Sequence, residues 1–236
     1  MSSCVPSLIS TPFWQSMVGQ DHLIGPGKPF RRIVESGQVP NLIFYGPSGV
    51  GKTTLAGIIA GVTNRRLFRL NATTASTADI KAIAAESDAL GAQNGVLLYL
   101  DEIQYFSKKQ QQTLLEHIEN GKITLIASTT ENPYFYVYSA ILSRSTVFEF
   151  KEVTPSEIEK AVRRAFDFLQ AEGKTAVTLE DGVVRQIALS CGGDVRKAIN
   201  AAELSVLSAQ LQRDGSRLVT LAGAEGVSQR SSMVSR

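Results

Sequence analysis

Residues 46–54 constrain the fold of this chain more than any other stretch. They are, in order, Gly46, Pro47, Ser48, Gly49, Val50, Gly51, Lys52, Thr53 and Thr54, which fit the pattern G-x-x-x-x-G-K-[ST]. The apolar run at 41–45 predicts a buried strand before them, and apolar residues at helical spacing over 54–60 predict a helix after them. A glycine-rich turn between a strand and a helix directs backbone N–H groups into a concavity that binds phosphate. We therefore expect a nucleoside triphosphate here, with Lys52 reaching its phosphates and Thr53 ligating Mg²⁺.

Length and composition limit what else the chain can be. It has 236 residues, enough for one large or two modest domains, and a net charge of +2, too small to indicate nucleic-acid binding without a local basic patch. No apolar run approaches the roughly 18 residues of a membrane span, so no membrane partner is expected. No Lys or Arg precedes Lys28, so the N-terminal segment lacks the positively charged start of a signal peptide. Cys4 and Cys191 lack a C-x-x-C spacing. These features indicate a reducing, cytoplasmic location.

A second stretch with candidate catalytic residues begins at residue 96. Five apolar residues, 96–100, are followed by Asp101 and Glu102, which predicts a buried strand with two carboxylates at its carboxyl end. Ligands of parallel α/β sheets bind at that edge. Asp101 is then placed to hold Mg²⁺ through water, and Glu102 to orient or deprotonate an attacking water. The alternative, a polar strand end that faces solvent, is disfavoured by the phosphate loop upstream.

The rest of the pattern predicts the fold class. Strands are expected at 66–70, 123–128 and 146–150, with helices at 72–90, where Gly91 ends the helix, and from Ser107 to Asn120. This is an α/β fold with a five-stranded, doubly wound parallel sheet over residues 1–153. A capping box at Thr154 then opens a small all-α lid domain of three helices, 154–212. The small, polar residues 213–236 predict a mobile tail, and residues 1–16 a loose N-terminal segment.

Three further features each have two interpretations. Lys108 and Lys109 point outward from their predicted helix, as a solvated face or as a nucleic-acid contact. The polar run 129–133 either senses the γ-phosphate or is simply a turn. The aromatic run 134–138 either packs against a neighbouring element or subunit, the interpretation we favour, or stacks on bases.

A nucleotide-binding α/β domain followed by a helical lid resembles the AAA+ ATPases. More specific are the runs 18–29, 128–133, 141–144 and 193–200, which are similar to motifs of the replication-associated recombination ATPases known as RarA or MgsA. The resemblance covers about residues 17–205. Members of that family continue into a C-terminal helical domain that holds a tetramer together. The resemblance therefore implies that this chain is the ATPase core and lid, with a tail that leads toward such an oligomerisation domain.

The resemblance also implies roles for individual residues. Thr129 would be the first sensor, contacting the γ-phosphate or the attacking water. Arg144 would be an arginine finger donated to the ATP of a neighbouring subunit, and Arg196 a second sensor that reaches ATP from the lid. Planar guanidinium groups suit phosphate oxygens, which agrees with both assignments. Val18, in the segment before the first strand, is expected to form part of the wall of the base pocket.

The function implied by the resemblance is Mg²⁺-dependent ATP hydrolysis on DNA, single-stranded or forked, in replication-fork maintenance, recombination and repair. A homo-oligomer and a single-stranded-DNA-binding protein are the expected protein partners. Two alternatives remain open: an ATP-dependent assembly switch and a clamp-loader-type subunit, each with little turnover of its own. A small GTPase is disfavoured, because no N-K-x-D run follows the fourth strand.

Overall fold

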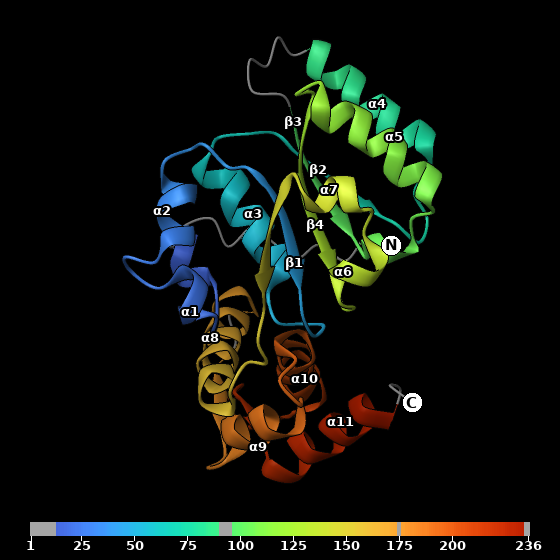
Figure 1. Ribbon diagram of the computed structural model, residues 1–236. Helices are drawn as coiled ribbons and strands as arrows, with labels where there is room; N and C mark the ends of the chain where they lie inside the picture. The colour runs from blue at the N-terminus through green and yellow to red at the C-terminus, as the bar shows by residue number, and fades with distance from the viewer. Residues whose placement is uncertain (1–12, 90–95, 174–175, 234–236) are drawn as a thin grey trace. The chain divides into compact units, whose positions relative to one another are not determined.

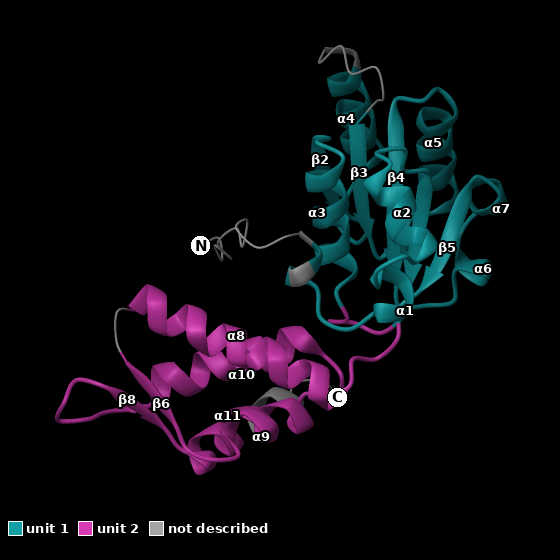
Figure 2. Ribbon diagram, turned by 90° about the vertical axis from the view of Figure 1, so that its left-hand side faces the viewer, with its two compact units in different colours: residues 1–46, 51–150 teal, residues 47–50, 151–236 magenta. Residues whose placement is uncertain are grey.

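The computed structural model describes residues 13–89, 96–173 and 176–233 of the chain. Cys4, the expected helix end at Gly91 and most of the N-terminal segment lie outside these residues. The chain divides into two compact units, Met1–Gly46 with Gly51–Phe150, and Pro47–Val50 with Lys151–Arg236 (Figure 2). The main part of the second unit begins at Lys151, close to the domain boundary expected after residue 153. None of the described helices is long and apolar enough to cross a membrane.

The first unit is built on a five-stranded parallel sheet. Its strands are β1 (Asn41–Tyr45), β2 (Leu67–Asn71), β3 (Val96–Asp101), β4 (Ile123–Thr129) and β5 (Ser145–Glu149), in the order β2-β3-β4-β1-β5. All five expected strands are present, each within about one residue of its predicted bounds. In β3 and β4 nearly every residue is buried, because helices cover both faces of a parallel sheet. The predicted doubly wound fold is confirmed.

Helices connect these strands and cover the sheet (Figure 1). They are η1 (Phe13–Ser16), α1 (Asp21–Ile24), α2 (Pro29–Glu35), α3 (Lys52–Val62), α4 (Thr77–Ala89), η2 (Ile103–Tyr105), α5 (Lys108–Glu119), α6 (Pro133–Tyr136) and α7 (Ser139–Leu142). Helices α4 and α5 lie side by side and pack, with α7, on a core that includes Ile80, Leu98, Leu114 and Leu125. Helix α3 packs on β3 and β4. The serine cap predicted at Ser107 is present as part of a capping box. The Ser107 Oγ accepts from the Gln110 N–H, and the Gln110 Oε1 accepts from the Ser107 N–H.

The second unit is mainly helical. It contains α8 (Pro155–Gly173), α9 (Val183–Ser190), α10 (Val195–Ser208) and α11 (Leu221–Met233), which pack on one another. A small sheet of β6 (Val177–Leu179), β8 (Arg217–Val219) and β7 (Gln210–Leu211) joins them. The predicted cap at Thr154 is present, where Glu157 accepts from the Thr154 N–H at 3.0 Å. Asp194 likewise caps α10 by accepting from the Lys197 N–H at 3.0 Å.

The structure differs from the expected lid in two places. The segment that starts at Thr178 is first a strand and only then helix α9, and the expected tail contains β8 and α11. Strand β6 pairs with β8 across a long sequence separation, which local patterns do not reveal. Helix α11 buries small residues such as Ala224 and Ser228, so it lacks the large apolar stripe by which a packed helix is recognised.

Candidate nucleotide-binding site

The phosphate loop joins β1 to α3, and the positions at which it requires glycine include Gly46 and Gly51. Gly46 has φ 139°, and a Cβ there would lie 2.2 Å from the backbone oxygen of Phe150. Gly51 has φ 102°, and a Cβ there would lie 2.6 Å from the Cε of Met17. Both conformations strongly favour glycine, and both sites lack room for a side chain. The motif glycines are therefore explained by tight backbone packing as well as by phosphate binding.

Lys52 is the first residue of α3, and its side chain lies back over the loop. Its Nζ donates a hydrogen bond to the backbone oxygen of Gly46 at 2.6 Å, and the residue is buried. An ammonium group there adds its charge to the partial positive charge of the α3 N-terminus. Together they form an anion site of the kind that the sequence predicts.

Three hydroxyl groups and a carboxylate form a connected cluster beside Lys52, which we call the hydroxyl cluster. Its members are Thr53, Tyr99, Ser128 and Asp101. The Tyr99 hydroxyl lies 3.0 Å from the Thr53 Oγ1, 2.9 Å from the Ser128 Oγ and 3.2 Å from the Asp101 Oδ1. The Ser128 hydroxyl makes a short bond to the same Asp101 oxygen. Tyr99 and Ser128 thus connect the two residues predicted to hold Mg²⁺.

The protons of the hydroxyl cluster can all be placed without conflict. If Thr53 donates to Tyr99, Tyr99 to Ser128 and Ser128 to Asp101, each proton is used once and the chain ends on a carboxylate, which only accepts. Burial raises the pKa of Tyr99 to about 12, and the nearby negative charge of Asp101 acts in the same direction. Tyr99 is therefore a protonated donor at neutral pH.

The sequence itself contains a local signal that Tyr99 belongs to the site. In the otherwise aliphatic run before Asp101, Tyr99 stands two residues earlier, so the two side chains share one face of β3. Ser128 offers no comparable signal. Its position beside Tyr99 depends on β4 lying next to β3, which only the tertiary structure reveals.

The residues present fit a magnesium ion with bound phosphates. Thr53 and Asp101 supply one hydroxyl and one carboxylate, hard oxygen ligands of the type that Mg²⁺ prefers. Within the described ranges, no group of three or more His, Cys, Asp and Glu side chains is placed to hold a metal ion. Such an ion would then take its other ligands from phosphate oxygens and water, as Mg²⁺ commonly does.

Glu102 follows β3 with a strained backbone. Its φ of 56° and ψ of 49° are left-handed, which costs a residue with a side chain roughly 1–2 kcal/mol. Its carboxylate accepts from the Gln104 Nε2 at 2.6 Å and from the Thr130 Oγ1 at 3.4 Å. The strained turn directs Glu102 out of the strand and between two polar side chains. Thr130 belongs to the polar run 129–133 that the sequence singled out, whereas Gln104 was not predicted.

Thr129 lies at the carboxyl end of β4, fully buried. Its backbone oxygen accepts from the Gly46 N–H at 3.2 Å, which ties it to the phosphate loop. Its hydroxyl accepts from the Glu131 N–H at 3.0 Å, so it takes part in a local turn. In this geometry the threonine that bonds to Glu102 is Thr130.

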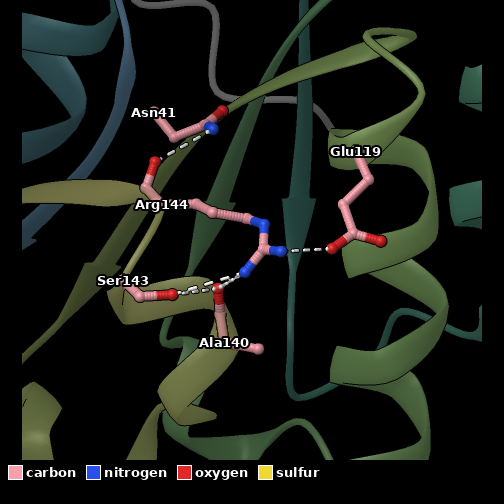
Figure 3. Close-up of polar contacts among 5 residues, drawn as sticks. All are labelled: Asn41, Glu119, Ala140, Ser143 and Arg144. Atoms are coloured by element: carbon pink, nitrogen blue, oxygen red, sulfur yellow. Dashed lines mark hydrogen bonds and ion pairs between the residues drawn. The ribbon is translucent and has the colours of Figure 1, made fainter.

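Arg144 directly precedes β5, level with the first residue of β1, and makes the contacts drawn in Figure 3. Its guanidinium pairs with Glu119 at 2.7 Å and donates to the Ala140 oxygen at 3.0 Å, while its backbone oxygen accepts from Asn41 at 3.3 Å. Asn41 begins β1 and the phosphate loop follows the end of β1, so the five residues of the strand separate them by roughly 15 Å. Any action of Arg144 on ATP therefore requires the ATP of another subunit.

The other two predicted residues lie outside this cluster. Arg196 is exposed in the first turn of α10, in the second unit. Val18 is half-buried in the segment between η1 and α1. A pocket of about 260 Å³ opens in that segment and is lined by Trp14, Met17, Gly19 and Arg31, among others, but not by Val18. The Arg31 guanidinium lies 5.1 Å from the centre of the Trp14 ring.

Comparison with known proteins shows which family this region of the chain resembles. Residues 42–155 match the model of the ATPase family associated with various cellular activities (AAA). The chain is 39% identical to replication-associated recombination protein A of Bacillus subtilis over 219 residues, which is 92% of this chain and 51% of that protein. It is 38% identical to the protein of the same name from Escherichia coli, over 86% of this chain and 46% of that protein. The chain thus spans about half the length of these curated relatives.

Solved structures show the same fold. The Thermotoga maritima RuvB Holliday junction branch migration motor matches with a TM-score of 0.69 at 21% identity, over 94% of this chain and 73% of that one. Identity this low supports the fold alone. The family match rests on the sequence, and its residues 42–155 contain the whole phosphate loop, the hydroxyl cluster and Glu102. Residues 42–155 therefore form a domain of the AAA family of ATPases, and the curated proteins that the chain resembles over most of its length include replication-associated recombination protein A.

Proposed function

We propose that this chain hydrolyses ATP in a Mg²⁺-dependent reaction and acts on single-stranded or forked DNA during replication-fork maintenance, recombination and repair, in the cytoplasm. The observation that carries the catalytic part is the meeting of Lys52, Thr53, Asp101 and Glu102 at one edge of the sheet. A phosphate-binding ammonium, two metal ligands and a carboxylate base are the parts that phosphoryl transfer to water needs. The DNA part rests on the similarity to replication-associated recombination protein A.

The proposed roles follow from position. Lys52 and the N-terminus of α3 would hold the β- and γ-phosphates, and Thr53 and Asp101 would hold Mg²⁺, which when bound offsets phosphate charge. Glu102 would take a proton from the attacking water. At the same time the water oxygen would bond to the γ-phosphorus, and the bond from that phosphorus to the bridging oxygen of ADP would break. Thr129 is proposed to position that water.

Completion of the site would require more than one subunit. Arg144 would enter the site of a neighbouring copy, where a guanidinium stabilises the charge of the transition state. Arg196 would reach ATP from the lid, and the segment around Val18 would contact the base. We therefore propose that the active form is a homo-oligomer, with a single-stranded-DNA-binding protein as a further partner.

An assembly switch with little turnover is the second candidate. The observation that favours it is the hydrogen bond from Gln104 to Glu102, because the amide occupies a carboxylate oxygen that would otherwise accept a proton from the attacking water. Under this alternative, Gln104→Ala would raise the turnover rate. Under the first proposal, the same change would leave the rate unchanged or lower it.

The experiment that tests the enzyme is ATP turnover at increasing protein concentration, with and without single-stranded or forked DNA. Glu102→Gln should retain ATP binding and lose turnover by at least about 100-fold, the lower range for general base catalysis. Glu203→Gln, the same change on an exposed residue of α10, is the matched control. Specific activity that rises with concentration would support action of Arg144 between subunits. Turnover that survives in Glu102→Gln would refute the role of the base, and absence of DNA stimulation in an assembled protein would refute action on DNA.

A further inference from the structure

Four exposed aromatic side chains lie on η2 and α6, and we call them the aromatic surface. Tyr105 is 63% exposed, Tyr134 66%, Phe135 81% and Tyr136 50%. Across the described residues, no other aromatic side chain is comparably exposed. The exposed large aliphatic side chains, by contrast, belong to the second unit: Leu189, Ile199, Leu204, Leu207 and Leu211. Tyr134, Phe135 and Tyr136 are therefore not buried against a neighbouring element of the same chain, whereas packing against a neighbouring subunit, the other part of the favoured interpretation, stays a prediction.

A buried glutamine holds the two elements of the aromatic surface together. The Gln111 Nε2 donates to the backbone oxygens of Phe106, just after η2, and of Tyr136, each at 3.1 Å. Its Oε1 accepts from the Tyr138 N–H at 2.7 Å. One side chain thus fixes the end of η2 and the end of α6 to helix α5. The aromatic surface is therefore preorganised, which lowers the entropic cost of binding a ligand.

Helix α6 is anchored so that its aromatic residues remain outside the core. Pro133 and Val137, on either side of the three aromatic residues, are buried. Asn132 caps the helix by accepting from the Tyr134 N–H at 3.0 Å. The core therefore requires only the flanking residues of α6. Exposure of three consecutive aromatic side chains adds nothing to folding, which points to a ligand.

Two lysines lie beside the aromatic surface. Lys108 and Lys109 are exposed in the first turn of α5, directly after η2, and the Lys108 Nζ lies 5.6 Å from the centre of the Tyr138 ring. The acids next to the same elements are Glu102, which is half-buried and bonded to Gln104 and Thr130, and Glu131, which is exposed before α6. Two cations beside exposed π faces suit a polyanion that carries flat rings, because phosphates pair with lysine while bases stack.

We propose that the aromatic surface binds single-stranded DNA, with bases stacked on Phe135 and its neighbours and phosphates beside Lys108 and Lys109. This inference rests on the proposed action on DNA and names the surface that carries it. An interface between copies of the chain is the rival occupant. Lys108 and Lys109 favour DNA over this rival, because protein interfaces are depleted in lysine whereas phosphates pair with it.

The test measures the affinity of the full chain for a fluorescein-labelled 20-nucleotide oligo(dT) by anisotropy, against a blunt duplex of the same length. Phe135→Ala should weaken oligo(dT) binding by roughly 5- to 150-fold, the range for loss of one stacked base. Phe135→Leu should weaken it similarly, because leucine keeps apolar area and lacks a π face, whereas Phe135→Trp should retain it. Leu207→Ala, at a similarly exposed apolar position in the second unit, is the matched control and should bind as the parent does.

Two further measurements make the outcomes distinct. Replacing Lys108 and Lys109 with glutamine should flatten the salt dependence of oligo(dT) binding by up to about 1.4 in logarithmic slope, about 0.7 per lost phosphate contact. Light scattering reports the oligomeric state of each variant. If the parent binds oligo(dT) and Phe135→Ala binds it with the same affinity, this inference is overturned, while the proposed action on DNA stands. A change in oligomeric state with unchanged affinity assigns the surface to a second copy. No binding of oligo(dT) by the parent overturns the inference and the single-stranded part of the proposed function together.

Discussion

Replacing Tyr99 with phenylalanine removes one oxygen atom from the centre of the hydroxyl cluster and changes little else. The side chain is 2% exposed, so the phenylalanine ring takes the same place without opening new surface. The one proton of the Tyr99 hydroxyl is donated to either Ser128 or Asp101, so the change removes one accepted bond, from Thr53, and one donated bond, whereas the bond from Ser128 to Asp101 remains. Each loss has a net effect near 1 kcal/mol. Thr53 is partly exposed and regains water, which reduces the total.

The expected destabilisation is therefore about 1.5 kcal/mol. For a protein of this size that lowers Tm by roughly 3–6 °C. The change should also weaken metal-dependent nucleotide binding, because groups that orient metal ligands typically contribute about 10-fold or more to metal affinity. We expect Mg²⁺-dependent ATP binding to weaken about 10-fold while ATP binding in EDTA stays unchanged.

Calorimetry and nucleotide titration with and without Mg²⁺ test this expectation. Tyr138→Phe is the matched control, since it removes a phenol hydroxyl away from the phosphate loop. A double-mutant cycle with Ser128→Ala should reveal coupling above about 0.5 kcal/mol, because the two hydroxyls bond directly. If Tyr99→Phe is as stable as the parent and binds Mg²⁺-ATP equally well, the hydroxyl cluster has no role in positioning Thr53 and Asp101.

Three other predictions concern pH, backbone and surface charge. Folding raises the pKa of Tyr99 from about 10 to about 12. The contribution of its protonated hydroxyl to the free energy of unfolding is therefore complete below pH 10 and is lost as the pH rises toward 12. Unfolding titrations over that range should show the parent losing about 2–3 kcal/mol more stability than Tyr99→Phe. Gly46→Ala should destabilise the protein by more than about 2 kcal/mol in thermal melts, whereas Gly37→Ala, also at positive φ but with open space around it, should cost only about 1 kcal/mol; equal losses would disprove the steric argument. Glu119→Gln should change stability by less than about 1 kcal/mol, since its pair with Arg144 is half-exposed, and a larger loss in denaturant titrations would show that the pair is structural.

Local patterns predicted the features that depend on neighbours in sequence. The cap at Ser107 and the bond from the Thr154 N–H to Glu157 form as expected, because these bonds span only three residues. The strand that ends in Asp101 and Glu102 likewise follows from its apolar run. The sequence did not reveal how Glu102 is held, since the left-handed turn and the bond from Gln104 depend on how η2 folds back.

The aromatic run shows where a sequence pattern leaves two interpretations open, although packing was the favoured one. Five aromatic or apolar residues in a row are compatible with burial or with display. The structure decides between them by burying Val137 and fixing Tyr136 through Gln111, which is 25 residues away in the sequence.

By itself, the sequence determined that this chain has a phosphate loop between a strand and a helix, a doubly wound sheet and two acids at a strand end. Periodicity and hydrogen bonding over a few residues encode these features. Only the tertiary structure decided that Tyr99 meets Thr53 and Ser128, which lie 46 and 29 residues away. Those contacts arise because β3 pairs with β4 and α3 packs on both strands, and long-range pairing of this kind leaves no local pattern in the sequence.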